Sequence, residues 1–343
     1  MTARAKTTHP LAFLATKVSD ATFRANLLAD AQSSRGTLAP ASERALRGDV
    51  LRFTIWCAKA GHSYEPASAE TVAAFVDAMS EAGKAPASIR RAVSSISTFH
   101  RAAKAENPAT TKVVTDALKR LHRERGRAQK QAAPITDDLV VRMLEASSEP
   151  RARARGTKRR TVLGGLRDRA LLAAAYATLA RRGELVALLA EDLQTDADGW
   201  GTIAIRRSKT DQQGEGAVAG IAPDAMTHLH AWLSAAAITS GPLFRKVDRH
   251  GRVGAALEAG SVSRIFKGMA RAAGLTAKGA TDFSGHSTRV GGAQDLIPFK
   301  ADMAGAMAVG RWKSTAMLAR YTKNQSARLG AAATVAAARK QFA

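Results

Sequence analysis

Apolar residues recur at helical spacing throughout the first third of the chain. The intervals are three or four residues, so each set of apolar positions lies on one face of a helix. The sets are Leu46, Val50, Phe53 and Cys57; Val72, Phe75, Val76 and Met79; Ile89, Val93, Ile96 and Phe99; and Val113, Val114, Ala117, Leu118 and Leu121. Ser68 and Ser88 are the predicted N-caps of the second and third helices. With a short helix expected around 23–31, this part of the chain is predicted to be small and entirely helical.

A charged stretch then separates two domains. Residues 120–134 (RLHRERGRAQKQAAP) carry few large apolar side chains and end in a proline, which is typical of an exposed linker. The chain of 343 residues is long enough for two domains of ordinary size. We predict flexible residues over 1–20, a helical domain over 21–126, a linker over 127–134 and a second domain over 135–343.

The second domain is predicted to combine helices with one β-hairpin. Residues 200–206 alternate apolar and polar positions as a strand does, 208–216 form a turn, and 217–222 return as a second strand. The expected fold class is therefore mainly α, with a small β-hairpin or sheet in this domain. Helices are expected at about 136–143, 166–179, 261–274, 286–296, 301–309, 314–322 and 326–341.

Charge indicates the kind of partner that the chain binds. Lys and Arg number 52 against 29 Asp and Glu, so the formal net charge is +23. Such an excess predicts a polyanionic partner, which is either a nucleic acid or an anionic membrane surface. No apolar run approaches the length of about 18 residues that crosses a membrane, and the N-terminal LAFLA is too short for a secretory segment. We therefore expect no membrane span, and charge alone leaves a nucleic acid or an anionic membrane surface as the partner.

Cysteine and histidine usage argues against other kinds of site. Cys57 is the single cysteine, which excludes an internal disulfide and fits a reducing cytoplasm. Cysteine and histidine do not cluster at the spacing of a zinc site. We predict a cytoplasmic protein associated with the nucleoid, with no metal and no cofactor.

The last sixth of the chain sets out residues suited to attack on a phosphodiester. Tyr321 carries a phenol, whose ordinary pKa of about 10 makes it a poor nucleophile until cations surround it. Once activated, it can attack phosphorus and form a covalent phosphotyrosine. Arg181 and Arg289 are candidates for the non-bridging oxygens, because a guanidinium stays charged and donates two parallel hydrogen bonds. His286 lies one helical turn before Arg289 and can donate to the same phosphate or take the tyrosine proton.

Three further residues complete this set. Lys209, in the turn RRSKTDQ, can protonate the leaving 5′ oxygen, and Trp312 offers an indole N–H to a phosphate oxygen. Glu184 lies one turn from Arg181 and can orient that side of the site. Each residue alone has an ordinary structural interpretation, such as a packed aromatic ring, a solvated lysine or a surface ion pair. In an ordered set on a basic chain, those interpretations require several coincidences at once.

Four segments resemble the tyrosine recombinase, or phage integrase, family. They are YATLARRGELVALLAEDL (176–193), RRSKT (206–210), SGHSTRVGGAQDL (284–296) and GRWKSTAMLARYTKN (310–324). The family pattern is Arg, Glu, Lys, His-x-x-Arg, then Trp or His, then Tyr nine residues later, and every position is filled. The resemblance implies a catalytic set made of Arg181, Glu184, Lys209, His286, Arg289, Trp312 and the nucleophile Tyr321.

The resemblance, which covers nearly the whole chain after about residue 20, also implies an activity and an assembly. The expected activity is site-specific DNA recombination through a 3′-phosphotyrosine, without metal or ATP. A helical core-binding domain and a catalytic domain are expected to form a C-shaped clamp around the duplex. Four protomers would hold two sites with inverted-repeat arms and pass through a four-way junction. The last helix, 325–342, would dock on a neighbouring protomer through the apolar residues Leu329, Ala333, Val335, Ala336 and Phe342.

Basic residues of the helical domain are candidates for contact with DNA. One group lies on the third predicted helix, where an arginine can read guanine in the major groove; contact with phosphate or solvent alone is an equally good interpretation. A second group runs toward the linker and suits phosphates, which position a protein without specifying sequence. The two groups are Ser88, Arg90, Arg91 and Arg101, and Lys119, Arg120 and Arg123.

One departure and two alternatives remain open at this point. Leu179-Ala180 stands where many relatives carry Gly-Leu. One alternative is a catalytically silent DNA-binding regulator, which the complete residue set disfavours. The other is an enzyme with related chemistry, either a type IB-like topoisomerase or a telomere resolvase, which the apolar C-terminal tail disfavours.

Overall fold

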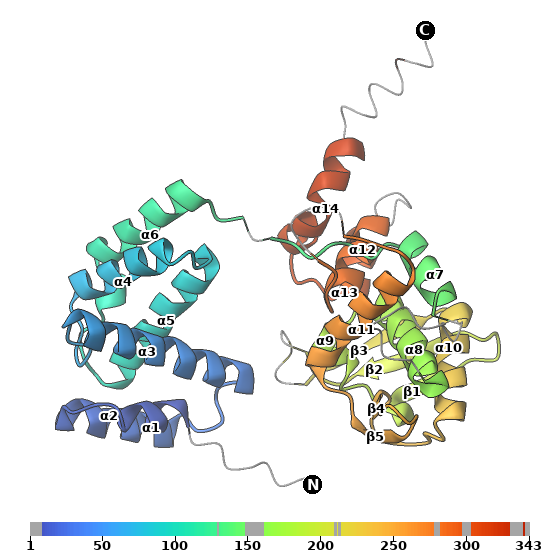
Figure 1. Cartoon of the computed structure of the whole chain (residues 1–343), viewed down its shortest axis with the longest axis horizontal. Coiled ribbons are helices and arrows are strands. Elements are labelled where there is room, and N and C mark those ends of the chain that lie inside the picture. The colour runs from blue at the N-terminus through green and yellow to red at the C-terminus, as the bar shows by residue number, and fades with distance from the viewer. Residues whose placement is uncertain are drawn as a thin grey trace. The chain divides into compact units, whose positions relative to one another are not determined.

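The computed structural model describes residues 9–128, 130–147, 161–208, 211, 214–277, 282–296, 303–329 and 339 (Figure 1). Contacts divide the chain into two compact units, Met1–Gln129 and Lys130–Ala343, which we call the N-terminal and C-terminal units. The architecture is mainly helical with small antiparallel sheets, as the apolar patterns predict. None of the helices in the described part of the chain is long and apolar enough to cross a membrane.

The N-terminal unit is helical throughout its described residues. Its helices are α1 (Pro10–Ala15), α2 (Ala21–Ser33), α3 (Pro40–Ala60), α4 (Ala69–Glu81), α5 (Pro86–Ala102) and α6 (Lys112–Arg125), with a short 3-10 turn, η1 (Pro108–Thr110). The predicted apolar faces of α3, α4 and α5 are all buried, and they form two neighbouring clusters. In α6 the expected face is only partly correct, because Val113 is exposed while Val114, Ala117 and Leu121 are buried.

Two expectations for the N-terminal unit are wrong. Flexible residues are predicted over 1–20; residues 1–8 lie outside the described residues, but Pro10–Ala15 forms α1 and buries Leu11 and Leu14 against α2 and α3. Because a proline is favoured at the first helical position, α5 begins at Pro86, and Ser88 lies inside the helix instead of capping it. The cap at Ser68 is confirmed, since its hydroxyl accepts a hydrogen bond from the Thr71 N–H.

The C-terminal unit packs helices around small antiparallel sheets. Its helices are α7 (Asp137–Glu145), α8 (Val162–Thr178), α9 (Arg182–Leu185), α10 (Pro223–Ala235), α11 (Ala259–Ala272), α12 (Ser287–Asp295), α13 (Met303–Gly310) and α14 (Thr315–Leu329), with a 3-10 turn, η2 (Ala190–Asp192). Its strands are β1 (Leu193–Thr195), β2 (Gly201–Ile205), β3 (Ala217–Ile221), β4 (Arg245–Val247) and β5 (Val253–Ala256). The predicted hairpin is confirmed as β2–β3, in which Ile203 pairs with Ala219.

Several elements of the C-terminal unit were not predicted. They are the edge strand β1, the hairpin β4–β5 and the helix α10. The sequence also predicted separate helices at 314–322 and 326–341, whereas α14 runs without a break from Thr315 to Leu329. No glycine or proline interrupts that stretch, so nothing local ends the helix there.

Helix α8 lies at the centre of the C-terminal unit. It packs against α7, α10, α12 and the strand β3 (Figure 1). Its buried residues lie on several sides of the helix. It ends at Leu179, which adopts the left-handed conformation with φ 48° and ψ 30°. The left-handed turn leads the chain directly to Arg181.

Candidate active site

The end of α8 and the start of α9 position Arg181 and Glu184. Arg181 is the N-cap of α9, and Glu184 accepts hydrogen bonds from the Arg181 backbone N–H at 3.0 Å and from its Nη1 at 2.7 Å. Burial by itself raises the pKa of Glu184, but these hydrogen bonds and the charges of Arg181 and Arg311 hold it below its ordinary value. Glu184 is therefore an ionised, buried carboxylate that fixes the first arginine.

Arg311 is a second partner of Glu184 that the sequence did not predict. Its Nη2 donates to Glu184 Oε2 at 3.1 Å, and its Nη1 donates to the Thr178 carbonyl at 3.0 Å. Its place beside Trp312 in the motif GRWKST was the one available signal. A position next to a site residue does not reveal which way a side chain points.

Glycines in α12 allow this helix to pack closely enough to bury its arginine. A Cβ on Gly291 would lie 1.8 Å from the Ile135 carbonyl oxygen, and one on Gly292 would lie 2.3 Å from the side chain of Leu179. The Ile135 N–H also donates to the Ser287 carbonyl at 3.0 Å. The two glycines of the motif therefore have a packing role, which places α12 against the segment that precedes α7.

Arg289 is the most deeply buried charge of the site. Its side chain is fully buried, and its Nη1 donates to the Leu179 carbonyl at 2.6 Å. Burial, with Arg181 nearby, lowers the pKa of Arg289 to about 10, so the guanidinium is still charged at neutral pH. Tyr321 lies near enough to oppose this fall in pKa, but by hydrogen-bond geometry the Nε and Nη2 of Arg289 have no partner within the described part of the chain. Buried donors on a cation are suited to an anionic ligand.

Tyr321 meets His286 beside this arginine. Its hydroxyl lies 3.0 Å from His286 Nε2, and its ring centroid lies 5.6 Å from that of Trp312. Burial lowers the pKa of His286 to about 4, and the charges of Arg289, Arg181 and Arg182 act in the same direction. At neutral pH the imidazole is therefore uncharged, and its Nε2 lies within hydrogen-bond distance of the phenol.

Trp312 and α12 complete the surroundings of the tyrosine. Trp312 is buried, its ring centroid lies 5.0 Å from Arg289 Cζ, and its Nε1 has no partner among the described residues. Gln294 Nε2 donates to the Tyr321 carbonyl at 3.1 Å, which links α12 to α14. The indole N–H and the free guanidinium nitrogens of Arg289 are thus donors of one buried cluster.

Six of the seven predicted catalytic residues come together in the C-terminal unit. Lys209, the seventh, lies outside the described residues. The six are linked by direct contacts or by electrostatic interaction between their charges. They are Arg181, Glu184, His286, Arg289, Trp312 and Tyr321.

The predicted DNA-binding residues lie on α5 and α6. Ser88 is half-buried and the other six are exposed. Some already have acidic partners: Arg91 binds Asp49 through Nε and Nη2 at 2.8 and 2.9 Å, and Arg120 lies 3.3 Å from Asp77. Asp49 therefore holds the side chain of Arg91 in place. The side chain of Arg90 is exposed, and no carboxylate of the described residues pairs with it.

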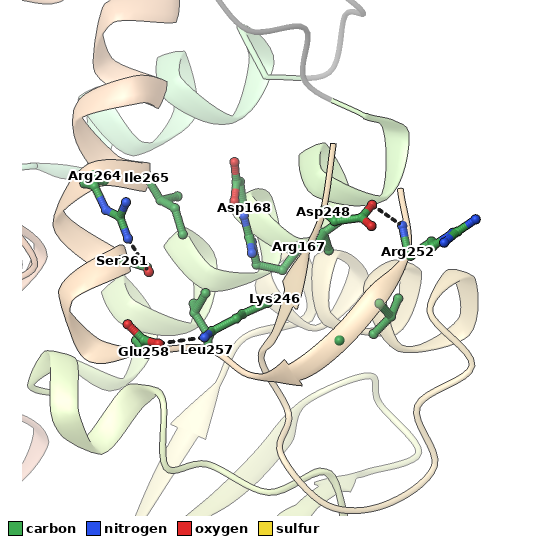
Figure 2. A pocket seen from close by; sticks show the side chains of 13 residues that line it. Arg167, Asp168, Lys246, Asp248, Arg252, Leu257, Glu258, Ser261, Arg264 and Ile265 are labelled. Carbon is green, nitrogen blue, oxygen red and sulfur yellow. Dashed lines mark hydrogen bonds and ion pairs between the residues drawn. The ribbon is translucent and has the colours of Figure 1, made fainter. Parts of the chain in front are cut away.

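The C-terminal unit also contains a hollow of about 780 Å³ that none of the predicted site residues lines (Figure 2). It lies among α8, the β4–β5 hairpin and α11. Two of its cations pair with carboxylates: Lys246 Nζ lies 2.6 Å from a Glu258 oxygen (Figure 2), and Arg167 Nε lies 2.6 Å from an Asp168 oxygen. Because none of the predicted catalytic residues lines this hollow, the cluster around Tyr321 is the better candidate for chemistry.

Comparison with known proteins agrees with this cluster. A family model described as Phage integrase family matches residues 135–328, which is more than half of the chain. The chain belongs to the phage integrase family. A second model, the N-terminal SAM-like domain of phage integrases, matches residues 26–107 in the N-terminal unit. The chain is thus a tyrosine recombinase with both family domains.

Two curated relatives and two solved structures are similar to this phage integrase family member. The Integrase/recombinase xerD homolog of Selenomonas ruminantium is 33% identical over 80% of this chain and 78% of its own length. Recombinase cre of Escherichia phage P1 is 25% identical over 81% of this chain and 82% of its own. The XerH recombinase bound to a palindromic difH substrate has a TM-score of 0.65 at 17% identity, covering 95% of this chain and 93% of that one. A lambda integrase tetramer bound to a Holliday junction has a TM-score of 0.52 at 19% identity, covering 91% and 74%.

Proposed function

We propose that this tyrosine recombinase cleaves and rejoins specific DNA sites with Tyr321 as its nucleophile. One observation carries the proposal: the Tyr321 hydroxyl lies 3.0 Å from a neutral His286, beside the buried guanidinium of Arg289. A phenol beside a proton acceptor and fixed cations is suited to attack on a phosphodiester, because the acceptor takes its proton and the cations stabilise its charge.

The proposed step exchanges one phosphate ester for another. The Tyr321 oxygen forms a bond to phosphorus, and the bond from phosphorus to the 5′ oxygen breaks, which leaves a 3′-phosphotyrosine. The phenol proton passes to His286, and Lys209 is the proposed donor to the leaving 5′ oxygen. Arg181, Arg289 and Trp312 meet the charge that develops on the non-bridging oxygens. A 5′ hydroxyl from another strand reverses the step, so the energy of the broken bond is conserved in the intermediate.

The proposed substrate is a duplex site with inverted-repeat arms, worked on in the cytoplasm by four copies of the chain. The tetramer of lambda integrase on a Holliday junction supports this assembly by analogy. Segment 325–342 is proposed to dock on a neighbouring copy; of this segment, only the backbone as far as Leu329 and residue 339 lie among the described residues. The basic residues of α5 and α6 are proposed to contact the arms, with Arg90 and Arg91 as candidates for base reading.

A suicide-substrate experiment tests the nucleophile. A binding site is first selected from a random duplex library, and nicked versions of that site are then incubated with the wild-type protein and with Tyr321→Phe. The wild type is expected to give an adduct that survives denaturation, and Tyr321→Phe is expected to bind the site without forming it. An adduct with the Phe variant would show that another residue is the nucleophile.

The same experiment separates the alternatives. Tight binding by the wild type without an adduct, at every nick position, would indicate a catalytically silent regulator. An adduct together with relaxation of supercoiled DNA, but without exchange between two sites, would indicate topoisomerase activity. Recombinant products from two sites would support the proposed function.

A further inference from the structure

Arg311 has a backbone conformation that side-chain-bearing residues rarely adopt. It follows α13 with φ 50°, in the left-handed region that favours glycine. The preceding Gly310 has no room for a Cβ, because that atom would lie 2.2 Å from the Trp312 ring. The turn is therefore fixed tightly from one side, yet an arginine occupies the strained position. Backbone strain that persists in a folded protein often accompanies a functional constraint.

The side chain of Arg311 is anchored at the end of α8. It is 13% exposed, and its Nη1 donates to the Thr178 carbonyl at 3.0 Å, one residue before the left-handed Leu179. Its Nε is buried without a partner in the described part of the chain. Burial lowers the pKa of Arg311, while the Glu184 carboxylate opposes that shift. A cation so deeply placed is stabilised mainly by its one carboxylate.

Glu184 is shared between two guanidiniums. Its Oε1 accepts from Arg181 Nη1 at 2.7 Å, while its Oε2 accepts from the Arg181 backbone N–H and from Arg311 Nη2. With both oxygens engaged, the carboxylate cannot rotate without losing a hydrogen bond. Glu184 therefore holds one edge of the Arg181 guanidinium through Nη1. The other guanidinium nitrogens of Arg181 can donate hydrogen bonds to a ligand.

We propose that Arg311 is a positioning residue for strand cleavage. It locks Glu184, and through Glu184 it holds Arg181 in the orientation that receives the scissile phosphate. This inference rests on the proposed function, because it concerns the same site. Arg311 is also the residue before Trp312, so its anchor on Thr178 fixes the start of the turn that carries the indole.

The test uses Arg311→Gly, which removes the guanidinium and leaves the backbone conformation allowed, since glycine adopts φ 50° without strain. Ala237→Gly is the matched control, because Ala237 is an exposed residue of the same unit with the same φ of 50°. Arg311→Lys keeps the charge but replaces the planar fork with a single ammonium. The measurements are the single-turnover rate of adduct formation at saturating nicked DNA, the affinity for that DNA and the melting temperature.

Arg311→Gly is expected to form the adduct about 10- to 100-fold more slowly, because a misplaced phosphate ligand costs rate more than binding. Its affinity for DNA should stay near that of Ala237→Gly, while its melting temperature should be lower, because the buried Glu184 loses one of its two guanidinium partners. Added guanidinium ion, below denaturing concentration, should restore part of the rate, and Arg311→Lys should be intermediate. A merely structural residue would give no such rescue.

The outcomes separate this inference from the proposed function. The positioning role is wrong if Arg311→Gly forms the adduct as fast as the wild type. It is also wrong if Arg311→Gly is slow, added guanidinium does not raise its rate, and Arg311→Lys reacts at the wild-type rate. If neither the wild type nor Ala237→Gly forms any adduct, the proposed function itself fails.

Discussion

Each unit of this protein buries a charge, but the two units surround it differently. In the N-terminal unit, Asp49 is 1% exposed and accepts hydrogen bonds from Arg91, Arg52 and Ser95 at 2.8 to 3.2 Å. In the C-terminal unit, Arg289 is 0% exposed, and its Nη1 donates a hydrogen bond to the backbone carbonyl of Leu179. Two of its nitrogens have no partner in the described part of the chain.

The difference indicates that the Asp49 charge stabilises the fold and that the Arg289 charge is available for chemistry. Burial alone raises the pKa of Asp49, but its bonds to Arg91, Arg52 and Ser95 hold it below the ordinary value, so the carboxylate links α3 to α5 as a satisfied network. Among the described residues no carboxylate pairs with Arg289 to offset its desolvation, so its burial costs stability. A cost of that kind is expected where a site is prepared for a polyanion.

The largest expected effect comes from removing the unbalanced charge. Arg289→Met should slow adduct formation about 100-fold or more, because a buried donor to the transition state is lost. The free energy of unfolding should stay the same or rise, by up to about 4 kcal/mol, because an apolar side chain replaces an unpaired cation. Single-turnover kinetics and urea denaturation measure the two quantities. A variant that cleaves normally but unfolds more easily would reverse the comparison.

Substitution of the two glycines at which α12 packs closely against its neighbours should have the next largest effect. Gly291→Ala places a Cβ against the rigid Ile135 backbone and should destabilise the C-terminal unit by about 3 kcal/mol, as overpacking does. Gly292→Ala meets the flexible end of Leu179 and should cost clearly less. Thermal unfolding of both variants gives the measurement. Equal costs would mean that backbone contact does not set the position of α12.

Breaking the balanced network should affect stability but not chemistry. Asp49→Asn removes the charge that holds Arg91 and should destabilise the N-terminal unit by about 1–3 kcal/mol. The adduct rate at saturating DNA should stay at the wild-type value, because the network contains no catalytic residue. Urea denaturation and single-turnover kinetics on the same preparation check this pair of outcomes. Unchanged stability would show that the network is not structural.

The pH dependence of stability should show that burial in the site lowers the pKa of His286. Its pKa is lowered to about 4, so between pH 6.5 and 4 the folded protein binds fewer protons at this residue than the unfolded chain does. Stability of the C-terminal unit should therefore fall as pH falls through that window, by up to about 1 kcal/mol per pH unit. His286→Asn should flatten the slope measured by urea denaturation. A slope that is unchanged in the variant would assign it to other groups of this unit, such as His228 on α10, whose pKa is also lowered by burial.

The smallest expected effect comes from Gly48, an open glycine that contrasts with the tightly packed Gly291. Gly48 lies within α3, and a Cβ there would meet nothing within 4 Å. Gly48→Ala should therefore stabilise the N-terminal unit by about 0.5–1 kcal/mol, because the unfolded chain loses freedom and the helix loses nothing. Differential scanning calorimetry against Gly291→Ala would show opposite signs. A destabilised Gly48→Ala would mean that helix propensity does not govern this position.

Local pattern predicted much of this fold because its causes are local. Helical spacing located α3 to α6, α8, α11 and α12, and period-two alternation located β2–β3. It missed β4–β5, whose strands are three and four residues long, since so short a run has no periodicity to detect. It also missed the burial of α1, because one turn and a half of helix is stabilised by the surface it packs on.

The chemical types of the site, and their order, were determined by the sequence alone: a tyrosine, a histidine, two arginines, a glutamate and a tryptophan at family spacing. Which charges are balanced was decided only by the tertiary structure. Arg91 meets Asp49 from 42 positions away, and Arg311 meets Glu184 from 127 positions away. Periodicity describes neighbours along one element, whereas such pairings depend on how separate helices pack and on which side chains that packing removes from water.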